Sequence, residues 1–229
     1  IVQRAFGGHR RGTTVRAPVF RARPHEPSLR VVRTASSQVS VRVACLGPGR
    51  GARTEPATEL LLRVIDDGTS TRLYETLCDR LGLCYEVFAG WEPYADVGLF
   101  DIGAEAQDDA IGEVLFELFG MMSDLAERGP TSAELDKAVQ RSRWQADRAA
   151  DQPESTAEDV ALSALWGAPL TPRDRAERLA RVEPADVRRV ARGLFRSGTL
   201  AVALVGSVSR STERQARTLL ERRAGKLSS

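Results

Sequence analysis

Histidine, lysine, methionine and cysteine are scarce in this chain of 229 residues. It has two histidines and two methionines, and its only lysines are Lys137 and Lys226. No stretch approaches the roughly 18 apolar residues that a membrane-spanning helix needs, so we expect a soluble chain without a membrane span. The three cysteines, Cys45, Cys78 and Cys84, form neither an even disulfide set nor a paired metal-binding spacing. Their number and spacing favour free structural thiols.

Charge is nearly balanced, with 33 basic and 31 acidic residues and a net charge of +2. Residues 1–34, however, contain eight arginines and a single acid, Glu26. Such an arm could bind an anion or a nucleic acid, but we expect a solvated linker and no nucleic-acid partner. The sequence leaves the compartment open between a bacterial cytoplasm and a periplasm.

The spacing of apolar residues predicts five strands and seven helices. In residues 38–46, Val39, Val41 and Val43 alternate with polar or small residues, as in a half-buried strand. Similar reasoning predicts further strands at 29–34, 84–91, 97–105 and 199–205. Helices are predicted at about 55–65, 70–80, 111–125, 131–149, 154–165, 172–180 and 184–195.

The order of these elements decides the fold class. Strands 84–91 and 97–105 are joined by a short turn, which predicts an antiparallel hairpin. Long helical stretches follow before the last strand, so strands and helices do not alternate regularly. We therefore predict an α+β fold with an antiparallel or mixed β-sheet and helices packed on one face.

The residues needed for hydrolytic chemistry are missing. A zinc hydrolase uses about three protein ligands and a nearby carboxylate. The only histidines, His9 and His25, lie in the arginine-rich arm, and neither H-E-x-x-H nor H-x-x-E-H occurs. The G-x-S-x-G elbow of serine hydrolases is also absent. We expect no catalytic residue and no metal or cofactor in this chain.

One segment resembles a known family. Residues 71–85, TRLYETLCDRLGLCY, are similar to the signature S-R-L-x-x-x-L-R-x-x-x-G-L-A-Y of the insulinase and pitrilysin-type zinc metallopeptidases, which include mitochondrial processing peptidase. The resemblance extends over about residues 38–208. It implies an insulinase-like domain of the metal-free, inactive kind, the C-terminal half of a clamshell whose other half carries zinc. Residues 1–6 then resemble the last helix of a preceding domain.

The resemblance also implies a substrate contact. In the metal-free half, an Arg and a Tyr seven residues apart help to hold the substrate backbone. Tyr85 lies at the Tyr position, and Cys78 occupies the Arg position. A thiol is a much weaker donor than a guanidinium. The nearby Arg72 and Arg80 should leave the helix on other faces than Cys78, so neither is a simple replacement.

Two residue-level alternatives stay open. Without the resemblance, Tyr85 would be interpreted as a half-buried strand aromatic. Cys78 and Cys84 could form a redox pair, although a helix end and a strand start seldom give the geometry of a disulfide, which favours inert thiols.

The resemblance therefore leads to a division of the chain and to two functions. Residues 1–27 are predicted to be the end of a preceding domain and a linker, 28–209 the non-catalytic domain, and 210–229 a basic tail. The first function is pairing with a zinc-bearing domain or subunit of the same family to bind a peptide substrate, with a homodimer as an open alternative. The second is a degenerate scaffold that no longer handles substrate.

Overall fold

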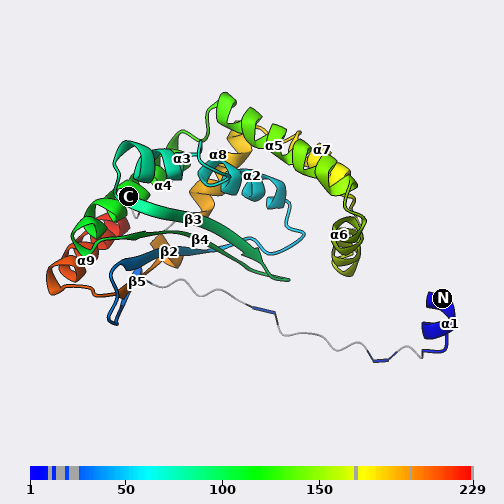
Figure 1. Cartoon of the computed structure of the whole chain (residues 1–229), viewed down its shortest axis with the longest axis horizontal. Helices are drawn as coiled ribbons and strands as arrows, with labels where there is room; N and C mark the ends of the chain where they lie inside the picture. The colour runs from blue at the N-terminus through cyan, green and yellow to red at the C-terminus, as the bar shows by residue number, and fades with distance from the viewer. Residues whose placement is uncertain (10–11, 14–18, 21–25, 168–169, 196, 228–229) are drawn as a thin grey trace.

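A mixed five-stranded sheet forms the centre of the described part of the protein. The computed structural model describes residues 1–9, 12–13, 19–20, 26–167, 170–195 and 197–227 (Figure 1). The strands are β1 (Ser28–Arg33), β2 (Val39–Gly47), β3 (Cys84–Pro93), β4 (Gly98–Ala106) and β5 (Ala201–Gly206). Their order in the sheet is β1-β5-β2-β4-β3, with β1 and β5 parallel and the other neighbours antiparallel. The predicted α+β class and mixed sheet are confirmed.

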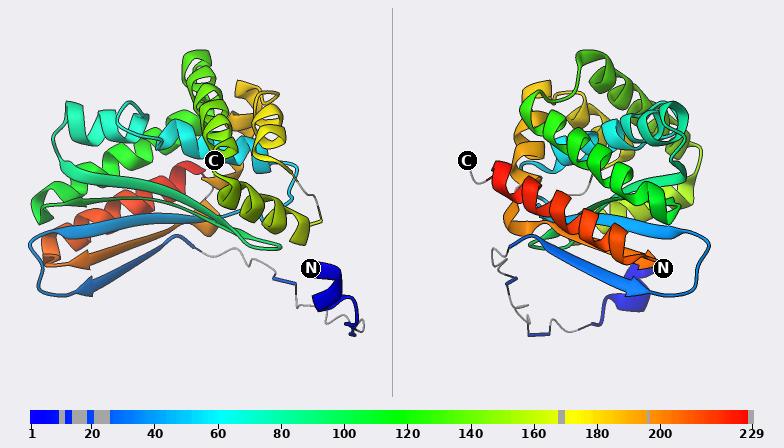
Figure 2. Two further views of the ribbon diagram at one scale, coloured as in Figure 1. Left: turned by 45° about the vertical axis from the view of Figure 1, so that its right-hand side comes forward. Right: turned by 90° about the vertical axis from the view of Figure 1, so that its left-hand side faces the viewer.

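The two faces of the sheet differ in their cover. On β2, Val39, Val41, Val43 and Cys45 are buried, whereas Arg42 between them is exposed. Helices lie on the face that carries the buried side chains, as the two turned views in Figure 2 show. We call the opposite side of the sheet the open face.

The helices occupy the predicted positions to within a few residues. They are α2 (Glu55–Ile65), α4 (Ile111–Glu127), α5 (Ser132–Ala150), α6 (Pro153–Leu165), α7 (Pro172–Leu179) and α8 (Pro184–Leu194). Shorter helical segments are α1 (Val2–Phe6), η2 (Asp108–Ala110) and η3 (Ser197–Thr199). Every residue of α1 is exposed.

The core depends most visibly on α4. Its apolar residues recur every three or four positions, so they share one helix face. The residues of this stripe are buried: Ile111, Val114, Leu115, Leu118, Phe119, Met122 and Leu125. Burying one such large side chain contributes about 1.5–3 kcal/mol, so this stripe anchors the helical layer to the sheet.

The helix predicted at residues 70–80 differs from expectation in its geometry. It is divided into α3 (Arg72–Tyr74) and η1 (Glu75–Arg80), and η1 is a π-helix. The segment ends at Gly82, which has a φ of +60° that favours glycine. The backbone N–H of Leu83 donates to the carbonyl of Leu77 at 2.9 Å, closing this wide turn directly before β3. Apolar periodicity could not distinguish a π-helix from an α-helix over so short a segment.

Residues 210–229, which the sequence suggested to be a basic tail, contain a packed helix. Helix α9 (Arg210–Leu227) lies against α4 and β1, and Ala216 and Leu220 on it are buried. The buried residues Thr212, Ala216, Leu220 and Arg223 follow helical spacing, but half of them are polar, so the stripe is weak in the sequence.

Among the described residues, no helix combines the length and the apolar character needed to cross a lipid bilayer.

Candidate functional site

Tyr85 stands in solvent at a β-bulge. In the β3–β4 ladder Cys84 pairs with Ala106 and Glu86 pairs with Glu105, so Tyr85 is the extra residue on β3. A bulge turns the local side chain away from the regular alternation of a strand. The Tyr85 side chain is accordingly 92% exposed. The alternative interpretation of Tyr85 as a half-buried strand aromatic is therefore wrong.

Cys78 lies in the π-helix η1 and packs partly against the core. Burial, and secondarily the charge of Asp79, raises the pKa of its thiol. The thiol is therefore neutral near pH 7 and carries no charge for a substrate carbonyl or carboxylate. The insulinase-type Arg position offers no strong donor in this chain.

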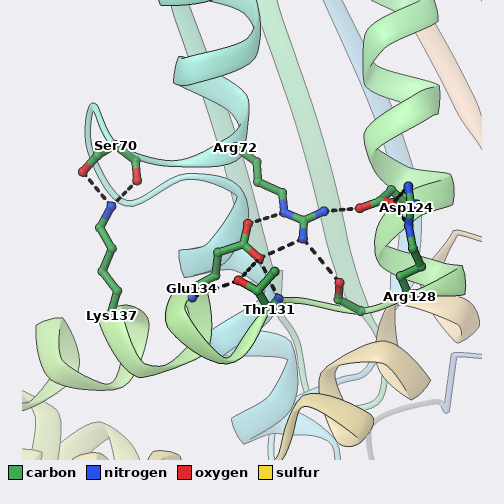
Figure 3. A network of polar contacts seen from close by, with 8 residues as sticks. Ser70, Arg72, Asp124, Arg128, Thr131, Glu134 and Lys137 are labelled. Atoms are coloured by element: carbon green, nitrogen blue, oxygen red, sulfur yellow. Dashed lines mark hydrogen bonds and ion pairs between the residues drawn. The ribbon is translucent and has the colours of Figure 1, made fainter.

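Arg72 forms hydrogen bonds and ion pairs that join three elements. Its Nε donates to Oε1 of Glu134 at 2.5 Å, and its Nη1 donates to Oδ2 of Asp124 at 2.5 Å. Its Nη2 donates to Oε2 of Glu134 at 2.8 Å and to the carbonyl of Gly129 at 3.3 Å. Figure 3 shows these contacts joining the start of α3 to the end of α4 and the start of α5. Arg72 is therefore structural.

Arg80, the other arginine near Cys78, is exposed and forms an ion pair with Glu117 on α4 at 3.4 Å. The prediction that neither arginine replaces a guanidinium at residue 78 agrees with their separate partners.

The carboxylate of Asp66 occupies part of the sheet edge. β3 is the last strand in the sheet order, so one of its sides has no neighbouring strand. The backbone N–H of Ala89 donates to Oδ2 of Asp66 at 2.8 Å. A carboxylate on an edge amide prevents another strand from pairing at that position. Nothing in the sequence around Asp66 indicates a contact with a residue 23 positions away.

An aromatic and ionic cluster lies on the open face beside β3. The guanidinium of Arg42 stacks 4.3 Å from the centre of the Phe88 ring and donates to Asp101 at 2.8 Å. A methyl group at Gly103 would collide with this ring. Glycine at that position therefore allows Phe88 to lie flat across the sheet. The cluster joins β2, β3 and β4, and strand pairing that the sequence does not contain brings its residues together.

All three cysteines are free in the structure. Burial raises the pKa of Cys45 to about 12, against the opposing effect of Arg223. Burial, with a smaller effect of Cys78, also raises the pKa of Cys84 to about 12. Neutral thiols are poor nucleophiles and poor metal ligands, which agrees with the inert thiols expected from the sequence.

The described residues do not fit a zinc ion. They contain no group of three or more His, Cys, Asp or Glu side chains arranged to hold a metal. His9 is exposed in the segment after α1, and His25 lies outside the described residues.

Comparison with known families gives one match that covers more than half of the chain. The family described as "Peptidase M16 inactive domain" matches residues 1–142. Among curated proteins, an uncharacterized zinc protease of Streptomyces coelicolor is 27% identical over 161 residues, which are 70% of this chain and 35% of that protein. An uncharacterized zinc protease of Rickettsia bellii is 26% identical over 148 residues, covering 64% of this chain and 36% of that protein.

Solved structures share the fold. A peptidase M16 inactive domain from Pseudomonas fluorescens superposes with a TM-score of 0.76 at 20% identity, covering 86% of this chain and 48% of that one. A protease from Helicobacter pylori gives a TM-score of 0.78 at 16% identity, covering 89% and 50%. The chain thus spans about a third of the length of the curated relatives it matches and about half of these solved chains.

Proposed function

Because the chain belongs to the peptidase M16 inactive domain family, we propose that it pairs with a zinc-bearing half and encloses a peptide substrate. Zinc and its activated water belong to that partner half, since the described residues offer no metal-holding group. The curated relatives are described as zinc proteases and are about three times as long as the matched region, which leaves room for such a half in the same chain. The partner is then an adjoining domain or a separate subunit.

The exposure of Tyr85 carries this proposal. A tyrosine that is 92% exposed at the start of an edge strand stabilises nothing in this domain. Its ring can cover an extended backbone, and its hydroxyl can donate to a substrate carbonyl or accept from an amide. In the paired protein it would contact the peptide beside the zinc.

The path of the peptide is limited by Asp66. Because Asp66 already accepts from the amide of Ala89, a substrate strand cannot pair along the whole of β3 without displacing this carboxylate. We therefore propose that the peptide crosses from Tyr85 onto the open face, where Phe88 and Arg42 offer an aromatic ring and a partly neutralised guanidinium.

The test compares two exposed tyrosines in the complete protein that contains the zinc-bearing half. Tyr85→Ala should raise KM for a peptide substrate about tenfold, the loss expected for one well-placed contact of about 1.4 kcal/mol. Tyr85→Phe removes the hydroxyl but keeps the ring, so it separates their contributions to KM. Tyr94→Ala is the matched control, because Tyr94 is also an exposed tyrosine, half in solvent, at the other end of β3. Equal kinetics for Tyr85→Ala and the unchanged protein would contradict the substrate contact.

Pairing is tested separately from substrate contact. Removing this domain should abolish cleavage by the zinc-bearing half. The two halves, produced as separate chains, should copurify. Unchanged activity in its absence would reject the enclosing role.

The second candidate function is a scaffold that pairs without handling substrate. Cys78 favours it, because a neutral, partly buried thiol stands where the family signature has an arginine. Cys78→Arg discriminates between the candidates. A gain of cleavage in the paired protein supports a substrate-handling half with a weakened site, whereas tight pairing without any gain supports the scaffold.

The domain boundaries predicted from the sequence change at one place, the C-terminal end. We propose that residues 1–27 are the end of a preceding domain and a linker, and that the non-catalytic domain begins at residue 28. Since α9 packs on α4 and β1, we propose that the domain continues through residue 227. A homodimer remains the alternative to pairing with a zinc-bearing partner.

A further inference from the structure

A cavity of about 320 Å³ lies among α2, α7 and α8, and arginines dominate its rim. Arg53 precedes α2, Arg178 lies in the last turn of α7, Arg181 follows that helix, and Arg189 lies on α8. None of these residues belongs to β3, β4 or η1, so this arginine pocket is separate from the Tyr85 site.

The positive charge of the arginine pocket is only partly neutralised. Among the described residues that line it, Asp186 is the one acid, and it pairs with Arg189 at 2.8 Å. Glu55, the next acid in sequence to Thr54, is engaged by the backbone N–H of Gly51 and by Arg50. Within the described ranges, Arg53, Arg178 and Arg181 make no ion pair. Three guanidinium groups therefore line one cavity without an acidic partner among the described residues.

Convergent unpaired arginines repel one another, and the protein gains no stability from placing them together. A multivalent oxyanion removes the repulsion and uses the planar donors of the guanidinium, which match phosphate oxygens in pairs. The start of α2 adds a smaller positive potential, and the Thr54 side chain makes no capping hydrogen bond there.

The rest of the cavity wall is apolar. Pro56, Ala57, Val182 and Val190 line it beneath the arginines. Ligand pockets of this size usually combine an apolar wall with a few polar groups that fix orientation. A ligand with both an anionic and a non-polar part matches this lining better than a free ion does.

We propose that the arginine pocket binds a compact polyphosphate group, such as the diphosphate of a nucleotide. The arginines hold the phosphate oxygens, and the apolar wall packs against the remainder of the ligand. This proposal is independent of the proposed function and stands or falls without a substrate or a zinc-bearing partner.

Isothermal titration calorimetry of the full chain at low salt tests the proposal. Pyrophosphate alone and ADP are the two probes, and tighter binding of ADP identifies a nucleotide as the source of the phosphate groups. Binding should weaken as salt rises, because the arginines are exposed and screened. The double variant Arg178→Gln/Arg181→Gln should weaken binding of either probe at least about tenfold, because it removes two guanidinium groups that donate charge-assisted hydrogen bonds to the phosphate oxygens.

Arg173→Gln is the matched control. Arg173 lies on the same helix, α7, is 88% exposed, and does not line the cavity. Its substitution should leave the dissociation constant within about twofold, the size of a remote surface-charge effect. Circular dichroism checks that each variant is folded. Absence of saturable binding of both probes, or an equal loss in Arg173→Gln and the double variant, overturns the proposal.

Discussion

Nε of Arg72 donates to Oε1 of Glu134 at 2.5 Å and so joins the start of α3 to the first turn of α5, 62 residues later in the chain. Glu134 also accepts from the backbone N–H and the hydroxyl of Thr131, which completes a capping box. One carboxylate therefore caps a helix and anchors the segment that leads to Tyr85 (Figure 3).

Loss of the Arg72 guanidinium should be costly. Arg72→Met leaves Glu134 and Asp124 without their partly buried cation, and such breaks cost about 3 kcal/mol. Urea unfolding measures the change in free energy. Arg128→Gln is the matched control, because Arg128 also contacts Asp124 but is 81% exposed, so its loss should cost under about 1 kcal/mol. Similar losses for both variants would contradict the anchoring role of Arg72.

Stability should depend on the ionisation of Glu134. Burial alone would raise the pKa of this carboxyl, but hydrogen bonds from Arg72 and Thr131 lower it from 4.5 to about 2. A depressed folded-state pKa stabilises the protein above the unfolded value of 4.5, and this contribution, reduced by solvent screening to about 1–2 kcal/mol, is lost as pH falls toward 2. Unfolding free energies measured between pH 6 and about pH 2 should fall less steeply for Glu134→Gln. An identical pH dependence for the variant would contradict this assignment.

The flat position of Phe88 should depend on Gly103. In Gly103→Ala the new methyl would collide with the Phe88 ring and with the carbonyl oxygen of Val41. Because the second contact is backbone, the sheet must shift, at a cost of about 1–3 kcal/mol. Gly120→Ala is the control, since nothing lies within 4 Å of a methyl at that exposed position of α4. It should instead stabilise the protein by about 0.5–1 kcal/mol. Thermal unfolding checks both predictions: the melting temperature should fall for Gly103→Ala and rise for Gly120→Ala.

Helix α9 should contribute to the stability of the domain. Leu220→Ala removes a side chain that is 4% exposed and should cost about 2–5 kcal/mol. Leu165→Ala, at a position that is 81% exposed on α6, should change stability by less than about 0.5 kcal/mol. If Leu220→Ala changed the free energy of unfolding as little as Leu165→Ala, residues 210–227 would behave as the dispensable tail suggested by their composition.

The predicted elements and the observed ones agree where the signal is local. The helix predicted at residues 111–125 and the alternation of β2 each depend on residues a few positions apart, and each was confirmed. Helix α9 was not predicted, because its buried stripe includes Thr212 and Arg223, whose burial depends on partners in other elements.

The candidate site shows the same limit. The signature around Tyr85 and the absence of a zinc motif were visible in the order of residues alone, since both are short linear patterns. Three other features were not visible in the order of residues. They are the bulge that exposes Tyr85, the hydrogen bond from the amide of Ala89 to Asp66, and the stacking of Arg42 on Phe88. Each of these depends on register between strands or on a contact between distant segments, and only the packed chain brings those partners within hydrogen-bonding or stacking distance.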